Sequence, residues 1–361
     1  MKIIKLFIFI FIFHNIMFAH YDTAYWNEYA ATQYRSGWMD WLPDEMLLSD
    51  LSLPGSHDTM TGGVKLKGHD IARTQAMNLR EQLISGIRVI DIRAKHNGNS
   101  FPIYHGIVNL GVDFGEVLRI VRDFLRQNPT ESIFMRFKQE NSSASDTEME
   151  KLFKKYYDSY KDIFWVNTSG TTNPKVGDFR GKLVLLSDVL SLNQYGLSYR
   201  YINKQDDYHL NANWDLYAKW DKIKAQFNRS NNSSGTIYMN YLSGSGGSFP
   251  YFVASGHSSP GTGAGRLVTG LTEPGWKGVY PDFPRGAWFG VIATIYFEGT
   301  NTLTADYLKK HKIALAGMVM ADFPGERLIN SIINCNLVKM QQKDLKKRDN
   351  RAKAILTRQS Y

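Results

Sequence analysis

Cysteine is almost absent from this chain, because Cys335 is the only one among 361 residues. A single cysteine excludes an intrachain disulfide framework and a metal centre built from several cysteine ligands. A chain of this length does not depend on disulfides, since 43% hydrophobic residues can bury a large core. Together with 21% charged and 13% aromatic residues, this composition is typical of a globular protein and not of a disordered one.

Long apolar runs are also lacking beyond the first nineteen residues. Lys2 and Lys5 precede a wholly apolar stretch, residues 6–13, and the small residue Ala19 follows a second apolar run. This order predicts a signal peptide over residues 1–19 and therefore a secreted mature protein. The alternative is an uncleaved membrane anchor, but the apolar stretch is shorter than the ~20 residues that a transmembrane helix needs.

Acidic residues are fewer than basic ones, 34 against 43, and the basic excess is concentrated at the C-terminus. Residues 336–361 contain eight basic and two acidic residues, a net charge of +6. Such a basic tail suits an anionic membrane surface, where each basic residue contributes ~1 kcal/mol of attraction. A solvated terminal helix is the alternative. The pI of 9.3 does not indicate nucleic-acid binding, because the charge is terminal and the protein is predicted to be exported.

Strand and helix patterns alternate along the rest of the chain. Apolar residues recur at three- and four-residue spacing over residues 112–127, which predicts an amphipathic helix. Short apolar runs predict buried strands at residues 51–53, 87–93, 101–104, 132–137, 183–186, 236–241, 290–296 and 315–321. This alternation predicts parallel β/α units without a break long enough to separate two domains. The expected fold is therefore α/β, a single, distorted TIM-type β/α barrel over residues 20–335.

Polar residues follow these predicted strands at their carboxyl ends. They are His57, Asp58, Asp91, Arg93, His105, Lys138 and Asp322. In a β/α barrel the carboxyl ends of the strands converge on one mouth, where such enzymes have their active sites. Two histidines, three carboxylates and two cations are therefore predicted to meet there.

The motifs that contain these residues resemble the catalytic X-domain of phosphatidylinositol-specific phospholipases C, in the small secreted form found in bacteria. The matching segments are LPGSHD at 53–58, GIR at 86–88, DIR at 91–93, YHG at 104–106 and MRFKQE at 135–140. Weaker matches occur at residues 205–208, 240–243 and 320–325. The resemblance spans most of the chain after residue 19, in the same order.

The resemblance implies a reaction and a set of catalytic residues. The family attacks phosphorus with the 2-hydroxyl of the substrate's own inositol, which releases diacylglycerol and forms a 1,2-cyclic inositol phosphate. By resemblance, His57 is the general base and Asp322 orients it, while His105 is the general acid with Asp58 as its partner. Histidine suits both roles because its ordinary pKa of ~6.5 lies near neutral pH.

Arg93 stands where metal-dependent relatives have a carboxylate ligand for calcium, and Lys138 replaces another acidic ligand. A guanidinium at the phosphate can do the electrostatic work of a metal ion. The resemblance therefore implies no metal and no other cofactor, with Asp91 holding Arg93 in place.

Lys138, Asp206 and Tyr208 match the positions at which the family binds inositol, two of them for ring hydroxyls and the aromatic for the ring face. The chain departs from the family after residues 184–187, where secreted relatives have an arginine and this chain has Asp188. An aspartate accepts hydrogen bonds from hydroxyls but cannot bind a ring phosphate, so phosphorylated head groups are expected to be disfavoured. The expected partner is an inositol phospholipid, which a monomer reaches by peripheral contact with a membrane surface.

Aromatic side chains in the glycine-rich loops are candidates for contact with lipid. They are Phe249, Tyr251, Phe252, Trp276, Tyr280, Phe283 and Trp288. For any one of them, packing against the rim of the barrel is the favoured alternative.

Two other functions stay open. The first is a different phosphodiesterase of the same barrel class, of the glycerophosphodiester or sphingomyelin type, which generally needs a divalent metal. The second is a non-catalytic module that binds inositol lipids. The presence of both His57 and His105 argues against such a module, because binding alone needs no acid–base pair.

Overall fold

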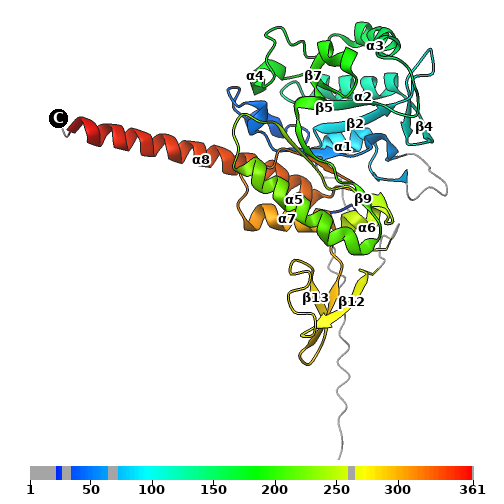
Figure 1. Cartoon of the computed structure of the whole chain (residues 1–361). Helices are drawn as coiled ribbons and strands as arrows, with labels where there is room; N and C mark the ends of the chain where they lie inside the picture. Colours follow the sequence, from blue (N-terminus) through cyan, green and yellow to red (C-terminus); the bar gives the residue numbers. More distant parts are fainter. Residues whose placement is uncertain (1–21, 27–33, 64–71, 259–264, 360–361) are drawn as a thin grey trace, which may run out of the picture.

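The computed structural model describes residues 22–26, 34–63, 72–258 and 265–359, with side chains described as far as residue 346. The predicted signal peptide, residues 1–19, lies outside these ranges. Figure 1 shows a rounded body of strands and helices, a long helix that projects from it, and a small sheet that stands apart from it.

Eight parallel strands form the main path of the central sheet, which curls into a barrel. In spatial order they are β7 (Gly196–Ser198), β6 (Leu183–Ser187), β5 (Ile133–Gln139), β2 (Val89–Ala94), β1 (Leu53–Ser56), β15 (Met318–Ala321), β10 (Tyr238–Tyr241) and β8 (Asn203–Gln205). Among the described strands, β7 and β8 are the ends of this path and do not pair with each other. The barrel is therefore open between them, as expected of a distorted β/α barrel.

Antiparallel strands extend this sheet or lie beside it. In the sheet itself, β3 (Pro102–His105) pairs with β2 and with β4 (Val108–Asp113). A two-stranded parallel ladder joins β9 (His209–Leu210) to β11 (Ser245–Gly246). A separate antiparallel sheet contains β12 (Val268–Glu273), β14 (Ile292–Tyr296) and β13 (Arg285–Phe289).

The strand predicted at residues 290–296 is β14, so its assignment to the barrel is wrong. An apolar run indicates a strand but does not identify its neighbours, and β14 pairs with two local antiparallel strands. The strand predicted at residues 101–104 is β3, which pairs antiparallel with β2 and also lies off the parallel path. The barrel is completed instead by β7 and β8, which have three residues each and are too short to show a periodic pattern.

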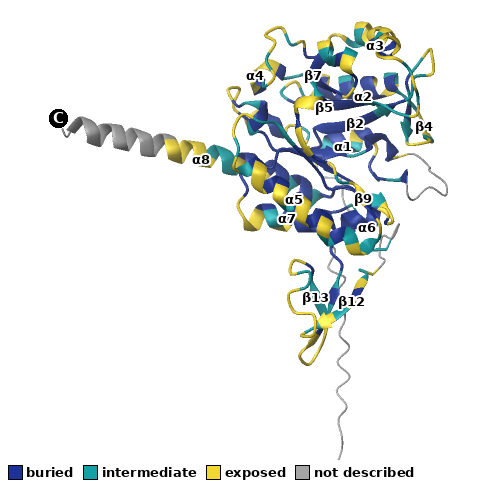
Figure 2. Cartoon of the chain, in the orientation of Figure 1, coloured by how far each residue is buried: buried dark blue, intermediate teal, exposed yellow. Residues whose placement is uncertain are grey.

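Helices cover the outside of the barrel, and Figure 2 shows the strands buried beneath them. The helices are α1 (Leu79–Ser85), α2 (Phe114–Gln127), α3 (Asp146–Tyr160), α4 (Val176–Phe179), α5 (Leu216–Asn231), α6 (Pro250–Ser255), α7 (Thr300–Lys310) and α8 (Glu326–Gln359). The helix predicted at residues 112–127 begins at Phe114, because Asp113 ends β4 and caps the helix by accepting a hydrogen bond from the Gly115 amide. Its apolar face is buried as predicted.

The last helix, α8, continues without a break through the boundary predicted at residue 336. Asn336 is buried, and its side-chain amide exchanges two hydrogen bonds of 2.8 Å with the backbone of Ser52. One turn and two turns further on, Lys339 and Lys343 both pair with Asp50. Beyond these contacts the helix leaves the body (Figure 1). None of the described helices combines the length and the apolar character needed to cross a membrane.

Candidate active site

The end of β1 places two adjacent polar residues at the mouth of the barrel. The His57 amide donates to the carbonyl of Ala321, which continues the pairing of β1 with β15. Asp58 then has a φ of 41°, in the left-handed region that aspartate tolerates better than most residues. The chain reverses here, so the two neighbouring side chains reach different partners.

Gly55 allows β1 to pack closely between its neighbours. A Cβ atom at this position would lie 2.5 Å from the sulfur of Met320 and 3.0 Å from the Cβ of Val89. The side-chain amide of Gln75 then holds the turn, because it donates to the carbonyls of both His57 and Ala321. Gly55, which follows Pro54 in the LPGSHD motif, is therefore a site of close strand packing just before the polar pair.

His57 contacts Asp322, which follows β15 directly. The distance from Nδ1 of His57 to Oδ1 of Asp322 is 2.8 Å. Burial, and after it the positive charge of Arg93, lowers the pKa of His57 well below its ordinary value. Burial also raises the pKa of Asp322 well above its usual range, and the charge of Asp58 adds to this. Both pKa shifts show that the site disfavours charge on this pair.

The position of the proton on the His57 ring follows from Arg93. Its Nη2 lies 2.7 Å from Nε2 of His57, and a guanidinium can only donate. Nε2 therefore accepts this hydrogen bond with its lone pair, and Nδ1 carries the proton of a neutral ring and donates to Asp322.

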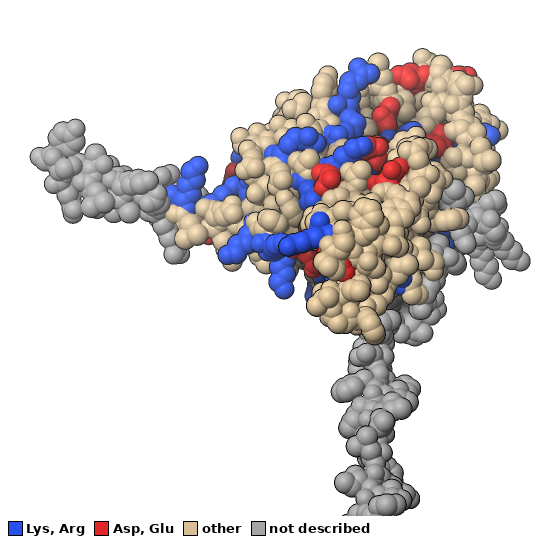
Figure 3. Space-filling model, turned by 60° about the horizontal axis from the view of Figure 1, so that its bottom comes forward, with Lys and Arg blue, Asp and Glu red and all other residues tan. Residues whose placement is uncertain are grey.

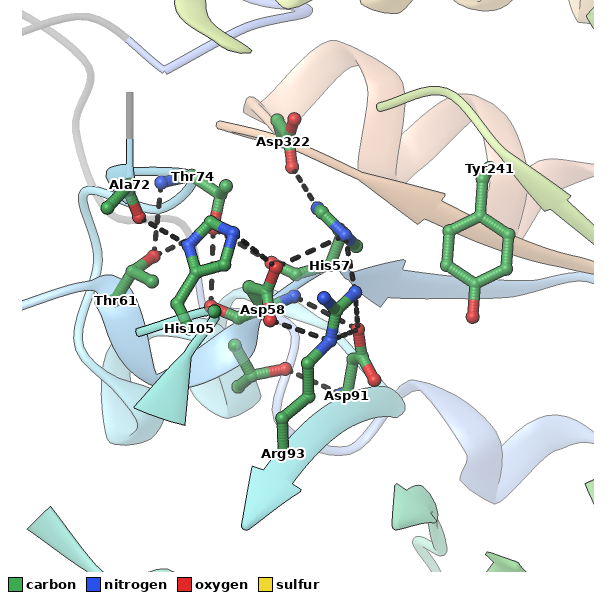
Figure 4. A network of polar contacts seen from close by, with 12 residues as sticks. His57, Asp58, Thr61, Ala72, Thr74, Asp91, Arg93, His105, Tyr241 and Asp322 are labelled. Atoms are coloured by element: carbon green, nitrogen blue, oxygen red, sulfur yellow. Dashed lines mark hydrogen bonds and ion pairs between the residues drawn. The ribbon is translucent and has the colours of Figure 1, made fainter. Parts of the chain in front are cut away.

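His105, at the end of β3, lies on the other side of Asp58 (Figure 4). Its Nδ1 is 2.8 Å from the carbonyl oxygen of Ala72, and its Nε2 is 3.1 Å from Oδ2 of Asp58. Since a carbonyl oxygen can only accept, Nδ1 of His105 donates to it, and Nε2 faces the Asp58 carboxylate. The centroids of the His57 and His105 rings are 6.4 Å apart.

Arg93 on β2 lies between these groups. Its Nε is 2.8 Å from Oδ1 of Asp58, and its Nη2 is 3.0 Å from Oδ2 of Asp91. Burial alone would raise the pKa of Asp91, but the guanidinium groups of Arg93 and Arg136 outweigh it and hold that pKa well below its usual range. Asp91 is therefore a fixed negative charge that anchors the arginine, as the sequence predicts.

A metal ion could in principle occupy the position of the Arg93 guanidinium. Among the described residues, His57, Asp58 and Asp91 each offer a ligand atom within 4.8 Å of the others. However, the Arg93 guanidinium already contacts a side-chain atom of all three residues. Its permanent positive charge would repel a cation in the same place, so this set of residues does not fit a metal site.

A cavity of about 290 Å³ opens over the two histidines. Its lining includes His57, Arg93, His105, Arg136, Lys138, Glu140, Asp206, Tyr208 and Asp322. The three residues predicted to bind inositol, Lys138, Asp206 and Tyr208, are therefore brought together with the histidines. Burial raises the pKa of Asp206, whereas Tyr208 is exposed at the rim.

Arg136 and Glu140 were missed by the sequence analysis. Arg136 lies two residues before Lys138 on β5, so strand periodicity places both side chains on the same face of the sheet. That spacing was a usable signal for Arg136. Glu140 follows the end of β5, and it lies 2.9 Å from the ammonium group of Lys138.

The chain is similar to known proteins in sequence and in fold. Residues 48–188 match the family model described as phosphatidylinositol-specific phospholipase C, X domain. The chain is 34% identical over 223 residues to the 1-phosphatidylinositol phosphodiesterase of Listeria monocytogenes, which covers 57% of this chain and 67% of that protein. The chain belongs to the phosphatidylinositol-specific phospholipase C family.

Other members of the phospholipase family extend the match. The 1-phosphatidylinositol phosphodiesterase of Staphylococcus aureus is 26% identical over 314 residues, 76% of this chain and 92% of that protein. The solved structure of the phosphatidylinositol-specific phospholipase C from Listeria monocytogenes superimposes with a TM-score of 0.62 at 26% identity, covering 84% of this chain and 98% of that one. The barrel fold predicted from the sequence is thereby confirmed.

The region matched by the phospholipase family model contains six of the predicted site residues, from His57 to Lys138. Asp206, Tyr208 and Asp322 lie beyond it. The structure brings these three to the same cavity through β8, the segment after it, and β15.

Proposed function

We propose that this protein is a phospholipase C that cleaves phosphatidylinositol into diacylglycerol and a 1,2-cyclic inositol phosphate, without a metal ion. The observation that carries the proposal is the pair of histidines on either side of one arginine. His57 contacts Asp322 through Nδ1. Oδ2 of Asp58 lies 3.2 Å from Nε2 of His57 and 3.1 Å from Nε2 of His105, and both histidines line one cavity.

His57 acts as the general base in this proposal. The lone pair on Nε2 of its neutral ring accepts from Arg93 before substrate binds, and Asp322 stabilises the positive charge that forms when the ring accepts a proton. When the phosphodiester binds, the Arg93 guanidinium gains an anionic partner, and Nε2 of His57 becomes available to the inositol 2-hydroxyl. The hydroxyl oxygen then attacks phosphorus as its proton moves to His57.

His105 acts as the general acid. In this proposal Nε2 of His105, which lies 3.1 Å from Oδ2 of Asp58, delivers a proton to the glycerol oxygen as the bond from phosphorus to that oxygen breaks. Arg93 stabilises the negative charge that increases on the phosphate oxygens in the transition state. The products are diacylglycerol and the cyclic phosphodiester, and the proton taken up by His57 balances the one given by His105.

The proposed enzyme is secreted and works at a membrane surface. We infer that residues 1–19 are removed on secretion and that the protein acts as a monomer on the membrane surface. Trp276, Trp288 and Phe249 are exposed and suit contact with lipid, whereas Tyr251, Phe252 and Phe283 are buried in the protein.

The test is diacylglycerol release by the purified protein from vesicles of phosphatidylinositol, with sphingomyelin vesicles and glycerophosphocholine as competing substrates, with and without EDTA. We expect turnover of phosphatidylinositol only, at the same rate in EDTA. Turnover of either competitor that EDTA abolishes would support a metal-dependent phosphodiesterase. Binding to phosphatidylinositol vesicles without any diacylglycerol release would support the non-catalytic module.

A further inference from the structure

A second arginine lines the cavity, and the catalytic steps above give it no role. Arg136 on β5 is buried, and only a small portion of its side chain is exposed to the cavity. Burying a guanidinium is costly unless charged partners compensate. Its position therefore calls for an explanation from the groups around it.

Arg136 is held by contacts on three sides. Its Nη2 lies 2.8 Å from Oδ2 of Asp188, which follows β6. Its Nη1 lies 3.4 Å from Oδ1 of Asp91 and 3.2 Å from the hydroxyl of Tyr241. The guanidinium carbon is also 4.5 Å from the ring centroid of Tyr199, a cation–π contact. These contacts fix one orientation of the side chain at the wall of the cavity.

Two of the five N–H groups of Arg136 have no partner among the described residues, and one of them, on Nη2, can reach a ligand. A guanidinium has five N–H groups, and the contacts above use both on Nη1 and one on Nη2. The Nε is buried and makes no hydrogen bond within the described part of the chain. The second hydrogen on Nη2 is thus free for an oxygen acceptor in the cavity, where Asp206 supplies the complementary acceptor. A polyol ring needs both a donor, from Arg136, and an acceptor, from Asp206, because each of its hydroxyls donates and accepts.

The charge of Arg136 is balanced, which limits what it can bind. Asp188 and Asp91 place a carboxylate on each terminal nitrogen of the guanidinium. The other cation away from the histidines, Lys138, pairs with Glu140. This part of the cavity therefore offers hydrogen-bond donors without an unpaired positive charge, which suits a hydroxyl and not a phosphate.

We propose that Arg136, positioned by Asp188, donates a hydrogen bond to a ring hydroxyl of the inositol head group, and that Asp188 excludes head groups with a further phosphate on the ring. This inference rests on the proposed function. Asp188 therefore acts through Arg136 as a positioning residue and sets the substrate preference of the pocket.

The first experiment measures the binding of myo-inositol by calorimetry and the kinetics of phosphatidylinositol cleavage for Arg136→Ala and Arg136→Lys. Losing a charged hydrogen bond should raise Kd and KM about tenfold or more, with a smaller change in kcat. Arg136→Lys should recover part of the loss. The matched control is Arg126→Ala, which removes an exposed arginine that pairs with Asp162 on the surface and should change neither constant.

The second variant, Asp188→Asn, keeps the size of a partly exposed side chain and is the safer test if the Arg136 variants unfold. It should raise KM for phosphatidylinositol and increase the turnover of phosphatidylinositol 4-phosphate relative to phosphatidylinositol by about tenfold. An unchanged ratio, or a folded Arg136→Ala variant with wild-type Kd for myo-inositol, would overturn the inference.

The two proposals fail in different ways. If the unmodified protein binds myo-inositol but releases no diacylglycerol, the proposed reaction is wrong, and the calorimetric comparison still decides the role of Arg136. If the unmodified protein cleaves phosphatidylinositol and the Arg136 and Asp188 variants behave like it, only the inference about these two residues is wrong.

Discussion

The two histidines of the site differ in their hydrogen-bond partners although their side chains are identical. Nε2 of His57 accepts from Arg93, so its ring is neutral. Nδ1 of His105 donates to a backbone carbonyl, and its Nε2 lies 3.1 Å from Oδ2 of Asp58. The proposed roles, a base at His57 and an acid at His105, follow from this difference.

Removing either histidine should abolish most of the activity. We expect His57→Ala and His105→Ala each to lower kcat by ~10²–10⁴-fold, because general acid–base catalysis contributes about that much. Thermal unfolding followed by circular dichroism should show that both variants remain folded. A variant that is folded and keeps more than about a tenth of the wild-type kcat would contradict the role given to its histidine.

The pH dependence of the reaction tests the environment of His57. Its pKa is lowered by burial and by Arg93, so the ring stays neutral at pH values where an ordinary histidine is already protonated. Because the base must be neutral to accept a proton, the acid limb of the kcat/KM profile should fall below the ordinary histidine pKa of ~6.5. Initial rates on a soluble phosphodiester substrate across this range provide the measurement. An acid limb above ~6.5 would show that burial does not control the base.

His57, Asp58, His105 and Asp322 could be predicted to lie together because each stands at or just after the carboxyl end of a strand, whereas Asp206 and Tyr208 were named only by the family resemblance. The sequence also contained the signal for Arg136, two positions before Lys138. Its pairing with Asp188 could not be predicted, because it depends on the register of β5 with β6 and on the rotamers of both side chains.

At the scale of elements, the packing of β1 against β15 and β2 determines where His57 and Asp58 lie. The barrel strands β2, β5 and β6 follow directly from apolar runs, whereas β4, β12 and β13, which are of similar length, were not predicted. The closure of the barrel does not, since β7 and β8 are too short to recognise and β14 belongs to another sheet. Pairing between strands that are far apart in the sequence depends on tertiary packing, which a local sequence pattern does not reveal.

A substitution in β1 tests this packing. Gly55→Ala places a methyl group too close to Met320 and Val89, and overpacking of this kind costs ~1–3 kcal/mol of unfolding free energy. Activity should also fall, because β1 has to shift relative to β15 and the His57–Asp322 contact lengthens. Chemical denaturation and a kinetic assay measure both effects.

Gly37→Ala is the control, since a Cβ at Gly37 meets no atom within 4 Å and its φ of −118° suits any residue. Equal stability of the two variants would show that close packing at Gly55 is not required.

At the scale of the whole molecule, α8 connects the core of the barrel to the basic C-terminus. Figure 3 shows most Lys and Arg side chains of this face on the half of the body next to α8. Two of the basic residues in the predicted tail, Lys339 and Lys343, pair with Asp50 and are not free for a membrane. An electrostatic contact therefore depends on the residues after Lys346, five basic and one acidic.

Truncation after Lys346 tests this contact without removing Asn336 from the core. Losing a net charge of +4 should weaken partitioning to anionic vesicles, at ~1 kcal/mol per basic residue near the surface. Vesicle sedimentation at low salt measures the effect, and partitioning to zwitterionic vesicles should stay the same. Unchanged binding to anionic vesicles would favour a helix end that serves only as a solvated terminus.

The central claim is that two histidines and one arginine convert phosphatidylinositol into a cyclic phosphate without a metal ion. The most direct measurement is a ³¹P NMR time course of the purified protein acting on phosphatidylinositol vesicles in excess EDTA. We predict that the resonance of a five-membered cyclic phosphodiester appears as the first product, at the rate seen without EDTA. A linear inositol phosphate as the first product, or loss of turnover in EDTA, would contradict the account.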